Sequence, residues 1–176
     1  MREVVIAGVG QTPVGEHWEL SLRSLAHRAV SAARKDAGDM RPDALYIGNL
    51  LGSVLSHQAN LGSLVAGNSG LEGIEAVTVE AGEASGAGAM RVGYLAVASG
   101  LIDTALVLGV EKYTDAVGPQ TEAAVSQVLD MDYEGMQGLT PSGLAGLVAQ
   151  RYLYETGAPR SALMPFALIA HENGAG

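Results

Sequence analysis

The sequence predicts an α/β domain in which helices cover a largely parallel sheet. Short apolar runs rich in Val, Leu and Ala alternate with longer segments of helical periodicity, which is the element order of such folds. The segments between successive apolar runs are long enough to hold a helix, so neighbouring strands are expected to run parallel. Hydrophobic residues make up 48% of the 176 residues but aromatics only 5%, which favours closely packed layers of small side chains.

The first predicted strand is the uninterrupted apolar run EVVIAGV at residues 3–9, which suits a strand buried on both faces. A loop, GVGQTPVG, follows it. Apolar residues then recur at helical spacing over residues 20–37, and Gly38 ends that helix. The same alternation continues along the chain, with strands at residues 44–48, 75–81 and 103–110 and helices at residues 58–67 and 84–100.

After Val110 the sequence changes character. Residues 112–140 mix polar and small residues, with a helix predicted near residues 121–129, and helices follow at residues 142–156 and 159–170. The stretch YEGMQGLTPSG precedes the first of these two helices. Met136 and Gln137 in it would line a pocket, since Met adapts to varied apolar ligands. The favoured interpretation is a capping loop, with Thr140 or Ser142 as the cap and Pro141 in the first turn.

Composition excludes several function classes. The net charge of −9 and the scattered basic residues give no footprint for nucleic acid. The absence of cysteine excludes disulfides, thiolate metal sites and thiol nucleophiles. No apolar run reaches the roughly 20 residues that span a membrane, and MREVVIAGVG lacks the shape of a signal peptide, so a cytoplasmic protein is expected. No metal site is expected, because the histidines are far apart in the sequence: His17, His27, His57 and His171.

The loop GVGQTPVG resembles a dinucleotide-binding fingerprint only in part. Gly8 and Gly10 fit the first two glycines, but Pro13 stands where the third is required. The next helix also begins about seven residues too late to cradle a phosphate. A plain connection between a strand and a helix is therefore favoured over nucleotide binding.

The stretch VTVEAGEASGAGAM at residues 77–90 reads as a strand that breaks into a helix, with Glu83 at the break. Backbone N–H groups and the helix dipole favour negative charge at such a point. A thiol at this position would be activated for nucleophilic attack. Here the residue is a carboxylate, whose acyl derivative would be a mixed anhydride exposed to hydrolysis.

Six segments resemble, in matching order, the N-terminal half of a thiolase of the sterol-carrier-type and archaeal, acetyl-CoA acetyltransferase-like branch. They are VVIAGVGQTPVG, LYIGNLLG, QANL, VTVEAGEASGAGAMRVGYLAVASG, DTALVLGVEKYTD and YEGMQGLTP. The resemblance implies a thiolase-like N-terminal βαβαβαβ core at residues 1–111. It also implies that residues 112–176 are part of the loop domain that covers the pantetheine arm of coenzyme A.

The resemblance further implies a coenzyme A thioester as substrate and no bound cofactor. Met136 and Gln137 would face the acyl or pantetheine part. Asn49, His57 and Gln58 would lie near the dimer face and the elbow of a neighbouring subunit. Each has a plain structural alternative: Asn49 as a turn former, His57 as a solvated loop residue and Gln58 at a helix start.

This sequence departs from the thiolase pattern twice. Glu83 occupies the position of the nucleophilic cysteine in V-E-A-x-C-A-S-G, and the C-terminal half with the remaining catalytic groups is missing. Cysteine-dependent thiolysis by this sequence alone is therefore excluded. The favoured hypothesis is a subunit of a homo- or hetero-oligomer that binds an acyl-CoA with a partner chain supplying the C-terminal half.

Two alternatives stay open at this stage. In one, Glu83 is the base of a carbon–carbon lyase that cleaves β-hydroxyacyl-CoA by retro-aldol chemistry. In the other, the chain is a non-catalytic assembly subunit, or a fragment or engineered form in which Glu83 is incidental.

Overall fold

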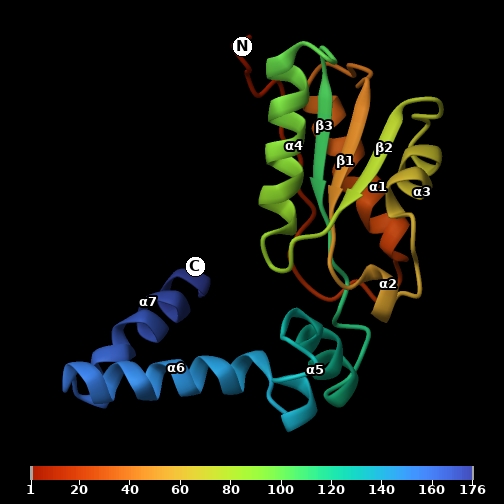
Figure 1. The fold of residues 1–176 in the computed structure, drawn as a ribbon. Helices are drawn as coiled ribbons and strands as arrows, with labels where there is room; N and C mark the ends of the chain where they lie inside the picture. The colour runs from red at the N-terminus through yellow and green to blue at the C-terminus, as the bar shows by residue number, and fades with distance from the viewer. Residues whose placement is uncertain (1, 176) are drawn as a thin grey trace. The chain divides into compact units, whose positions relative to one another are not determined.

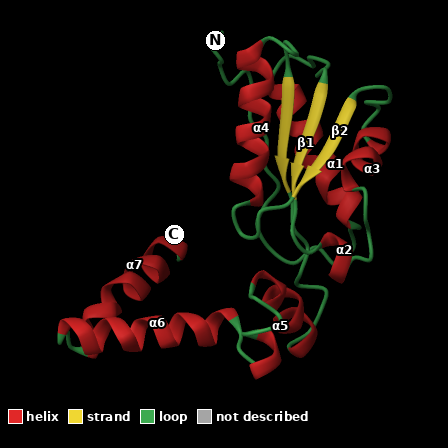
Figure 2. Cartoon of the chain, in the orientation of Figure 1, coloured by secondary structure: helices red, strands yellow, loops and turns green. Residues whose placement is uncertain are grey.

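The computed structural model describes residues 2–175, and the chain divides into two compact units, Met1–Ala124 and Val125–Gly176. The first unit contains the sheet and its covering helices, and the second is helical (Figure 2). The division of roles predicted between residues 111 and 112 stays a prediction.

The first unit is built on a parallel sheet of three strands in the order β2-β1-β3 (Figure 1). β1 is Ala44–Gly48, β2 is Glu75–Val79 and β3 is Ala105–Gly109. The strands are in register, so that Gly48 lies opposite Val79 on one side and Gly109 on the other. All three carboxyl ends therefore meet at one edge of the sheet, and the predicted α/β class is confirmed.

Helices cover both faces of this sheet. α4 (Ser85–Ser99) packs on one face, and α1 (Leu22–Asp36) and α3 (Leu61–Asn68) pack on the other (Figure 1). Because successive side chains of a strand point to opposite faces, β1 serves both layers. Leu45 and Ile47 pack with α1 and α3, whereas Tyr46 packs with α4.

Local chemistry explains where two of the long helices begin and end. The Ser21 side chain accepts a hydrogen bond from the Ser24 backbone N–H at 3.2 Å and so caps α1. α4 ends at Gly100, whose φ of +82° only glycine adopts without strain. The predicted strand at residues 44–48 and the helices predicted around residues 20–37 and 84–100 are thus confirmed, with shifts of two residues or fewer at each end.

The strand predicted at residues 3–9 is wrong. Residues 2–13 contain neither a turn nor a bend, so the backbone is extended as the apolar run predicts, but it pairs with no strand of the sheet. The segment therefore adopts the extended backbone that its sequence favours, but it lacks the hydrogen bonds to a neighbouring strand that define a β-strand. The reason is tertiary, since pairing requires a neighbouring strand and this segment has none among residues 2–175.

The connection from β1 to α3 also differs from the prediction. A short helix, α2 (Gly52–Leu55), was not predicted, and the helix predicted at residues 58–67 begins only at Leu61. His57 and Asn60 have φ values of +50° and +55°, which interrupt helical geometry between the two helices.

Helix α5 (Pro119–Val125) joins the two units along the chain and replaces the helix predicted near residues 121–129. In the second unit, α6 (Pro141–Thr156) confirms the helix predicted at residues 142–156. The helix predicted at residues 159–170 starts as a 3₁₀ turn, Arg160–Leu163, and continues as α7 (Met164–Gly174). Further 3₁₀ turns lie at Ser126–Val128 and Gly135–Gln137.

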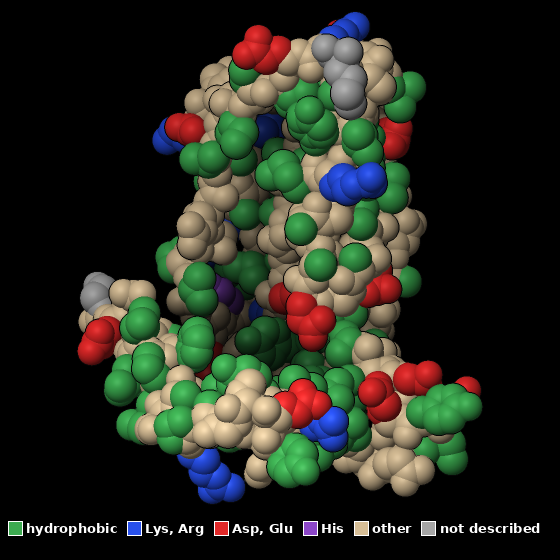
Figure 3. All heavy atoms as spheres, turned by 60° about the vertical axis from the view of Figure 1, so that its left-hand side comes forward, with side chains coloured by type: hydrophobic (Ala, Val, Ile, Leu, Met, Phe, Trp, Pro, Cys, Tyr) green, Lys and Arg blue, Asp and Glu red, His purple; other side chains and the backbone are tan. Residues whose placement is uncertain are grey.

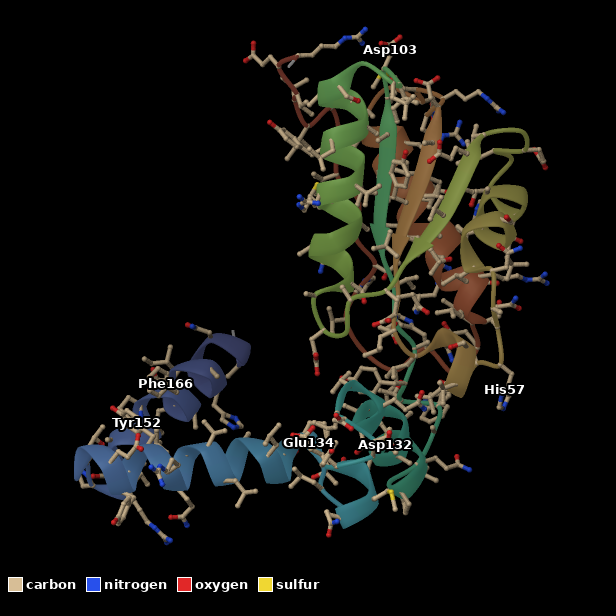
Figure 4. The ribbon with its side chains drawn as sticks, in the orientation of Figure 1. His57, Asp103, Asp132, Glu134, Tyr152 and Phe166 are labelled. Carbon is tan, nitrogen blue, oxygen red and sulfur yellow. The ribbon has the colours of Figure 1, made fainter. Side chains whose placement is uncertain are left out.

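Neither α6 nor α7 buries a residue within the part of the chain described. Tyr152 on α6 and Phe166 on α7 are 50% and 74% exposed (Figure 4). Across residues 2–175 no helix is long and apolar enough to cross a membrane. On the face of the first unit that carries α4, hydrophobic side chains reach the surface among isolated charged groups (Figure 3).

Candidate functional site

The candidate site lies at the edge of the sheet where the strands end, at the corner between β2 and α4. β2 ends at Val79, Gly82 takes a φ of +58°, and α4 begins at Ser85. Two turn hydrogen bonds close the corner, from Ala84 N to Ala81 O at 3.0 Å and from Ser85 N to Gly82 O at 3.1 Å. Only a residue tolerant of positive φ, such as glycine, makes this sharp turn without strain.

The corner is held from inside by Ser85. Its side-chain oxygen accepts from the Ala81 N–H at 2.9 Å and donates to the Gly82 carbonyl at 2.6 Å. Ser85 is 5% exposed, so both hydrogen bonds are shielded from water. Outside the turn, the Glu80 carboxylate accepts from the Gly82 N–H at 2.6 Å. The backbone on both sides of Glu83 is therefore fixed by side chains that the sequence places within five residues of it.

The Glu83 side chain is exposed, and within residues 2–175 it takes part in no hydrogen bond or ion pair. It stands two residues before the first residue of α4, where the helix dipole favours a negative charge. Its carboxylate therefore lies exposed at the corner and is not engaged in a structural hydrogen bond or ion pair. The structure places Glu83 between a strand and a helix, as the sequence predicts.

The end of β1 lies directly against this corner. A Cβ added to Gly48 would stand 2.5 Å from the Ser85 carbonyl oxygen and 2.6 Å from the Gly86 nitrogen, both backbone atoms. Glycine is therefore required for β1 to approach the first turn of α4 so closely. Asn49 follows at once, and its backbone N–H donates to the Val79 carbonyl at 3.2 Å.

Asn49 is buried, at 6% exposed, and belongs to a clamp that joins the ends of β1 and β3. Its side-chain Nδ2 donates to the Val110 carbonyl at 2.8 Å and to the Glu111 carboxylate at 2.5 Å. Its Oδ1 accepts from the Gly52 N–H at 3.0 Å, at the start of α2. The structure therefore shows Asn49 in the turn-forming role, and its place near a dimer face stays a prediction.

Glu111 is the residue of this edge that sequence reasoning missed. Its carboxylate accepts from the Leu50 N–H at 2.6 Å and from the Leu51 N–H at 3.2 Å, besides the Asn49 amide. Three donors on one carboxylate form a strong, charge-assisted group of hydrogen bonds. One feature of the sequence indicates Glu111: it is an acidic residue directly after a predicted strand, in VLGVEK.

His57 and Gln58 lie in the loop after α2. His57 is exposed and points away from the rest of the unit (Figure 4). Gln58 is half-buried, its backbone N–H donates to the Gly52 carbonyl at 3.0 Å, and its side chain donates to the Ala59 carbonyl at 2.7 Å. The clamp at Glu111 thus fixes the start of the segment that presents both residues.

Met136 and Gln137 lie in the second unit, in the 3₁₀ turn Gly135–Gln137 that precedes α6, and their place beside an acyl or pantetheine group stays a prediction. Met136 is 78% exposed. The Thr140 hydroxyl accepts from the Gly143 N–H at 3.1 Å, which confirms that Thr140 caps α6. No three His, Asp or Glu side chains within residues 2–175 are grouped so that they could hold a metal ion.

Comparisons with known proteins agree with this architecture. Residues 4–176 match the family model described as "Thiolase, N-terminal domain". The acetyl-CoA acetyltransferases of Methanothermobacter thermautotrophicus and Methanocaldococcus jannaschii are 40% and 42% identical over 98% of this chain. The benzoylsuccinyl-CoA thiolase subunit BbsB of Thauera aromatica is 33% identical over 89% of this chain and 40% of its own length.

Among solved structures, the 3-oxoacyl-[acyl-carrier-protein] synthase III of Aquifex aeolicus has a similar fold. The TM-score is 0.52 at 21% sequence identity, over 58% of this chain and 33% of that one. This likeness concerns the fold alone. The chain spans about half the length of the curated relatives it matches, 45% and 44% of the two archaeal enzymes.

Proposed function

Because the chain belongs to the thiolase N-terminal domain family, we propose that it is a thiolase-like subunit that binds an acyl-CoA thioester together with a partner chain. The match over residues 4–176, in a chain without cysteine, carries the proposal. Such a chain keeps the corner that holds the nucleophile in thiolases but offers no sulfur there. The reacting groups that the corner lacks would then come from the partner.

The coenzyme A thioester is supported by the relatives, three of which have acetyl-CoA or a CoA thiolase in their names. The proposal of a partner is supported by the name of one relative, and not by the chain's coverage of 45% and 44% of the two archaeal relatives. One relative is itself named as a subunit. The acyl chain is not specified by any residue of the first unit.

The test is a native mass measurement of the protein purified from its own source, followed by titration with acetyl-CoA. We expect a complex with a second chain similar to the C-terminal part of thiolases, and saturable acetyl-CoA binding by that complex. A protein that is purified alone, or a complex indifferent to acetyl-CoA, would contradict the proposal.

A second candidate function is carbon–carbon bond cleavage with Glu83 as the base, and the exposed, unengaged carboxylate at the corner favours it. Glu83 would take the proton of a β-hydroxyl group. The bond between the α- and β-carbons then breaks to leave a carbonyl product and the enolate of the shorter acyl-CoA, which takes up a proton.

The variant Glu83→Gln separates the two candidates. It should abolish cleavage of a 3-hydroxyacyl-CoA if Glu83 is the base, and should leave acyl-CoA binding by the complex intact. Glu72→Gln is the matched control, because Glu72 is an exposed acid of the same unit that precedes β2, at the opposite end from the corner. Equal cleavage activity of the unsubstituted protein, Glu83→Gln and Glu72→Gln would exclude a catalytic role for Glu83.

A further inference from the structure

Four acidic side chains follow closely on the carboxyl ends of β2 and β3: Glu80, Glu83, Glu111 and Asp115. Three of them hold the structure together. Glu80 accepts from the Gly82 N–H at 2.6 Å, and Asp115 pairs with Lys112. Glu111 accepts from three donors of the clamp. Of these four side chains, only that of Glu83 has no hydrogen bond or ion pair within residues 2–175.

Glu83 is also the one unengaged oxygen nucleophile that the corner between β2 and α4 offers. The sequence contains no cysteine, and residues 79–90, VEAGEASGAGAM, contain no lysine, histidine, threonine or tyrosine (Figure 1). The only hydroxyl among them belongs to Ser85, which is 5% exposed and donates to the Gly82 carbonyl at 2.6 Å. A hydroxyl becomes a good nucleophile when a neighbouring base takes its proton, and a backbone carbonyl is no such base.

Little side-chain bulk surrounds the Glu83 carboxylate. Its neighbours in the sequence are Gly82, Ala84 and Gly86, besides the buried Ser85. Ala84 and Gly86 are exposed, and a Cβ added to Gly86 would meet no atom within 4 Å. Because Glu83 is itself exposed, both an acyl group and a water molecule can reach its carboxylate in the described chain.

We propose that Glu83 gives the chain an acyl-CoA hydrolase activity, with the acyl group carried on Glu83 as a mixed anhydride. This inference rests on the proposed function, which brings an acyl-CoA to the corner. In the first step, a carboxylate oxygen of Glu83 bonds to the carbonyl carbon of the thioester. The carbon–sulfur bond breaks, and coenzyme A leaves as its thiolate.

Water completes the reaction. It attacks the anhydride, the bond between the acyl group and Glu83 breaks, and the carboxylate is restored. One proton of that water neutralises the coenzyme A thiolate, and the other leaves on the carboxylic acid. A thioester and water have then become a carboxylic acid and a thiol. Because the corner is open to water and an anhydride is more reactive than a thioester, hydrolysis is favoured over transfer of the acyl group to a second acyl-CoA.

The test measures the products formed from acetyl-CoA by the protein purified from its own source, with any chain that accompanies it. Acetyl-CoA has no β-hydroxyl group, so retro-aldol cleavage with Glu83 as base releases nothing from it. A thiol-reactive dye detects free coenzyme A, and this chain contributes no thiol of its own. We expect acetate and free coenzyme A in equal amounts, whereas condensation of two acetyl-CoA molecules would release coenzyme A without acetate.

Glu83→Gln should reduce the release of acetate to the rate of acetyl-CoA in buffer, because the amide does not replace a carboxylate as nucleophile. Since Glu83 is exposed and makes no structural contact in the described chain, its replacement leaves the unit folded. Glu72→Gln is the matched control, because Glu72 is an exposed acid at the other end of β2, and it should release acetate at the unsubstituted rate.

Hydroxylamine tests the covalent step. It attacks the anhydride and converts a fraction of Glu83 into the hydroxamate at each turnover, and the modified protein does not return to the cycle. Inactivation should therefore accumulate when acetyl-CoA and hydroxylamine are present together, and not with either alone. Peptide mass spectrometry should locate the hydroxamate at residue 83.

Any of three results would overturn the hydrolase: acetate release no faster than in buffer, release that persists in Glu83→Gln, or turnover in hydroxylamine that leaves residue 83 unmodified. Native mass and acetyl-CoA titration report on the proposed function separately. A complex that binds acetyl-CoA without hydrolysing it contradicts the hydrolase and leaves the proposed function standing. A chain that is purified alone and hydrolyses acetyl-CoA does the reverse.

Discussion

Removing the Glu111 carboxylate tests whether the clamp at the end of the sheet stabilises the fold. Glu111→Ala deletes the acceptor of the Asn49 amide and of the Leu50 and Leu51 N–H groups. Hydrogen bonds to a charged group contribute about 1.5–3 kcal/mol each when buried, and Glu111 is half-buried. Leu50 is half-buried and can bond water, whereas Leu51 is 5% exposed and its N–H would be stranded.

We therefore expect Glu111→Ala to lower the free energy of unfolding by about 3 kcal/mol, with the buried Leu51 N–H and the Asn49 amide as the main contributions. Glu111→Gln keeps one acceptor oxygen but loses the charge, so about half of that loss is expected. Urea unfolding followed by circular dichroism measures both values. With a slope near 2 kcal/mol per molar urea, the alanine variant should unfold about 1.5 M earlier.

Hydrogen exchange adds a local measurement to the unfolding curve. The amides of residues 50 and 51 should exchange faster in Glu111→Ala, while those of β2 should change only through global stability. Glu72→Ala is the control, because Glu72 is exposed and its side chain makes no contact of this kind in the described chain. The reasoning is refuted if Glu111→Ala costs less than about 0.5 kcal/mol, the range of an ordinary surface substitution.

Three further predictions concern single groups of the fold. Burial raises the pKa of Tyr46 to about 12, together with the hydrogen bond to Glu75 and the negative charge of Glu75. The free energy of unfolding should therefore be constant below about pH 10 and fall by roughly 2–3 kcal/mol as the pH rises from 10 to 12. Urea unfolding at several pH values should show no such fall in the Tyr46→Phe variant. Gly48→Ala would place its Cβ 2.5 Å from backbone at the start of α4 and should cost about 1–3 kcal/mol in urea unfolding; an unchanged midpoint contradicts that packing. Thr140→Ala removes the cap bonded to Gly143 and should cost about 1 kcal/mol, seen as helix lost on mild heating, whereas Thr140→Ser should retain it.

Sequence patterns predicted the elements whose identity is decided within the element itself. β1 is bounded as predicted because five consecutive residues, ALYIG, are all buried and are followed by a turn. α6 was predictable because Thr140 and Pro141 mark its start and Gly157, with a φ of +67°, marks its end. The corner at Glu83 was predictable for the same reason, because Gly82 signals a sharp turn directly after an apolar run.

The clamp could not be predicted, because its partners are about 60 residues apart in sequence. Glu111 reaches Asn49 only because β3 lies beside β1, and no local pattern states which strands become neighbours. The left-handed residues His57 and Asn60 were missed for a related reason. Neither is glycine, so the tertiary fold and not the residue type imposes their conformation.

The N-terminal segment shows what separates a local preference from a completed structure. Residues 3–9 have the composition of a buried strand, and their backbone is extended, yet Ile6 remains 78% exposed. α6 and α7 repeat the pattern in the second unit, where helices with sound caps and turns bury no residue of their own among those described. In both places the backbone adopts the conformation that the local sequence favours, but the apolar side chains stay exposed. Since burial of apolar area drives folding and association alike, covering these surfaces would stabilise the protein. Ile6→Asp should therefore leave the free energy of unfolding of the chain alone nearly unchanged, because Ile6 is 78% exposed. A partner that covered the segment would raise that free energy with the logarithm of the partner's concentration, and Ile6→Asp would reduce the gain.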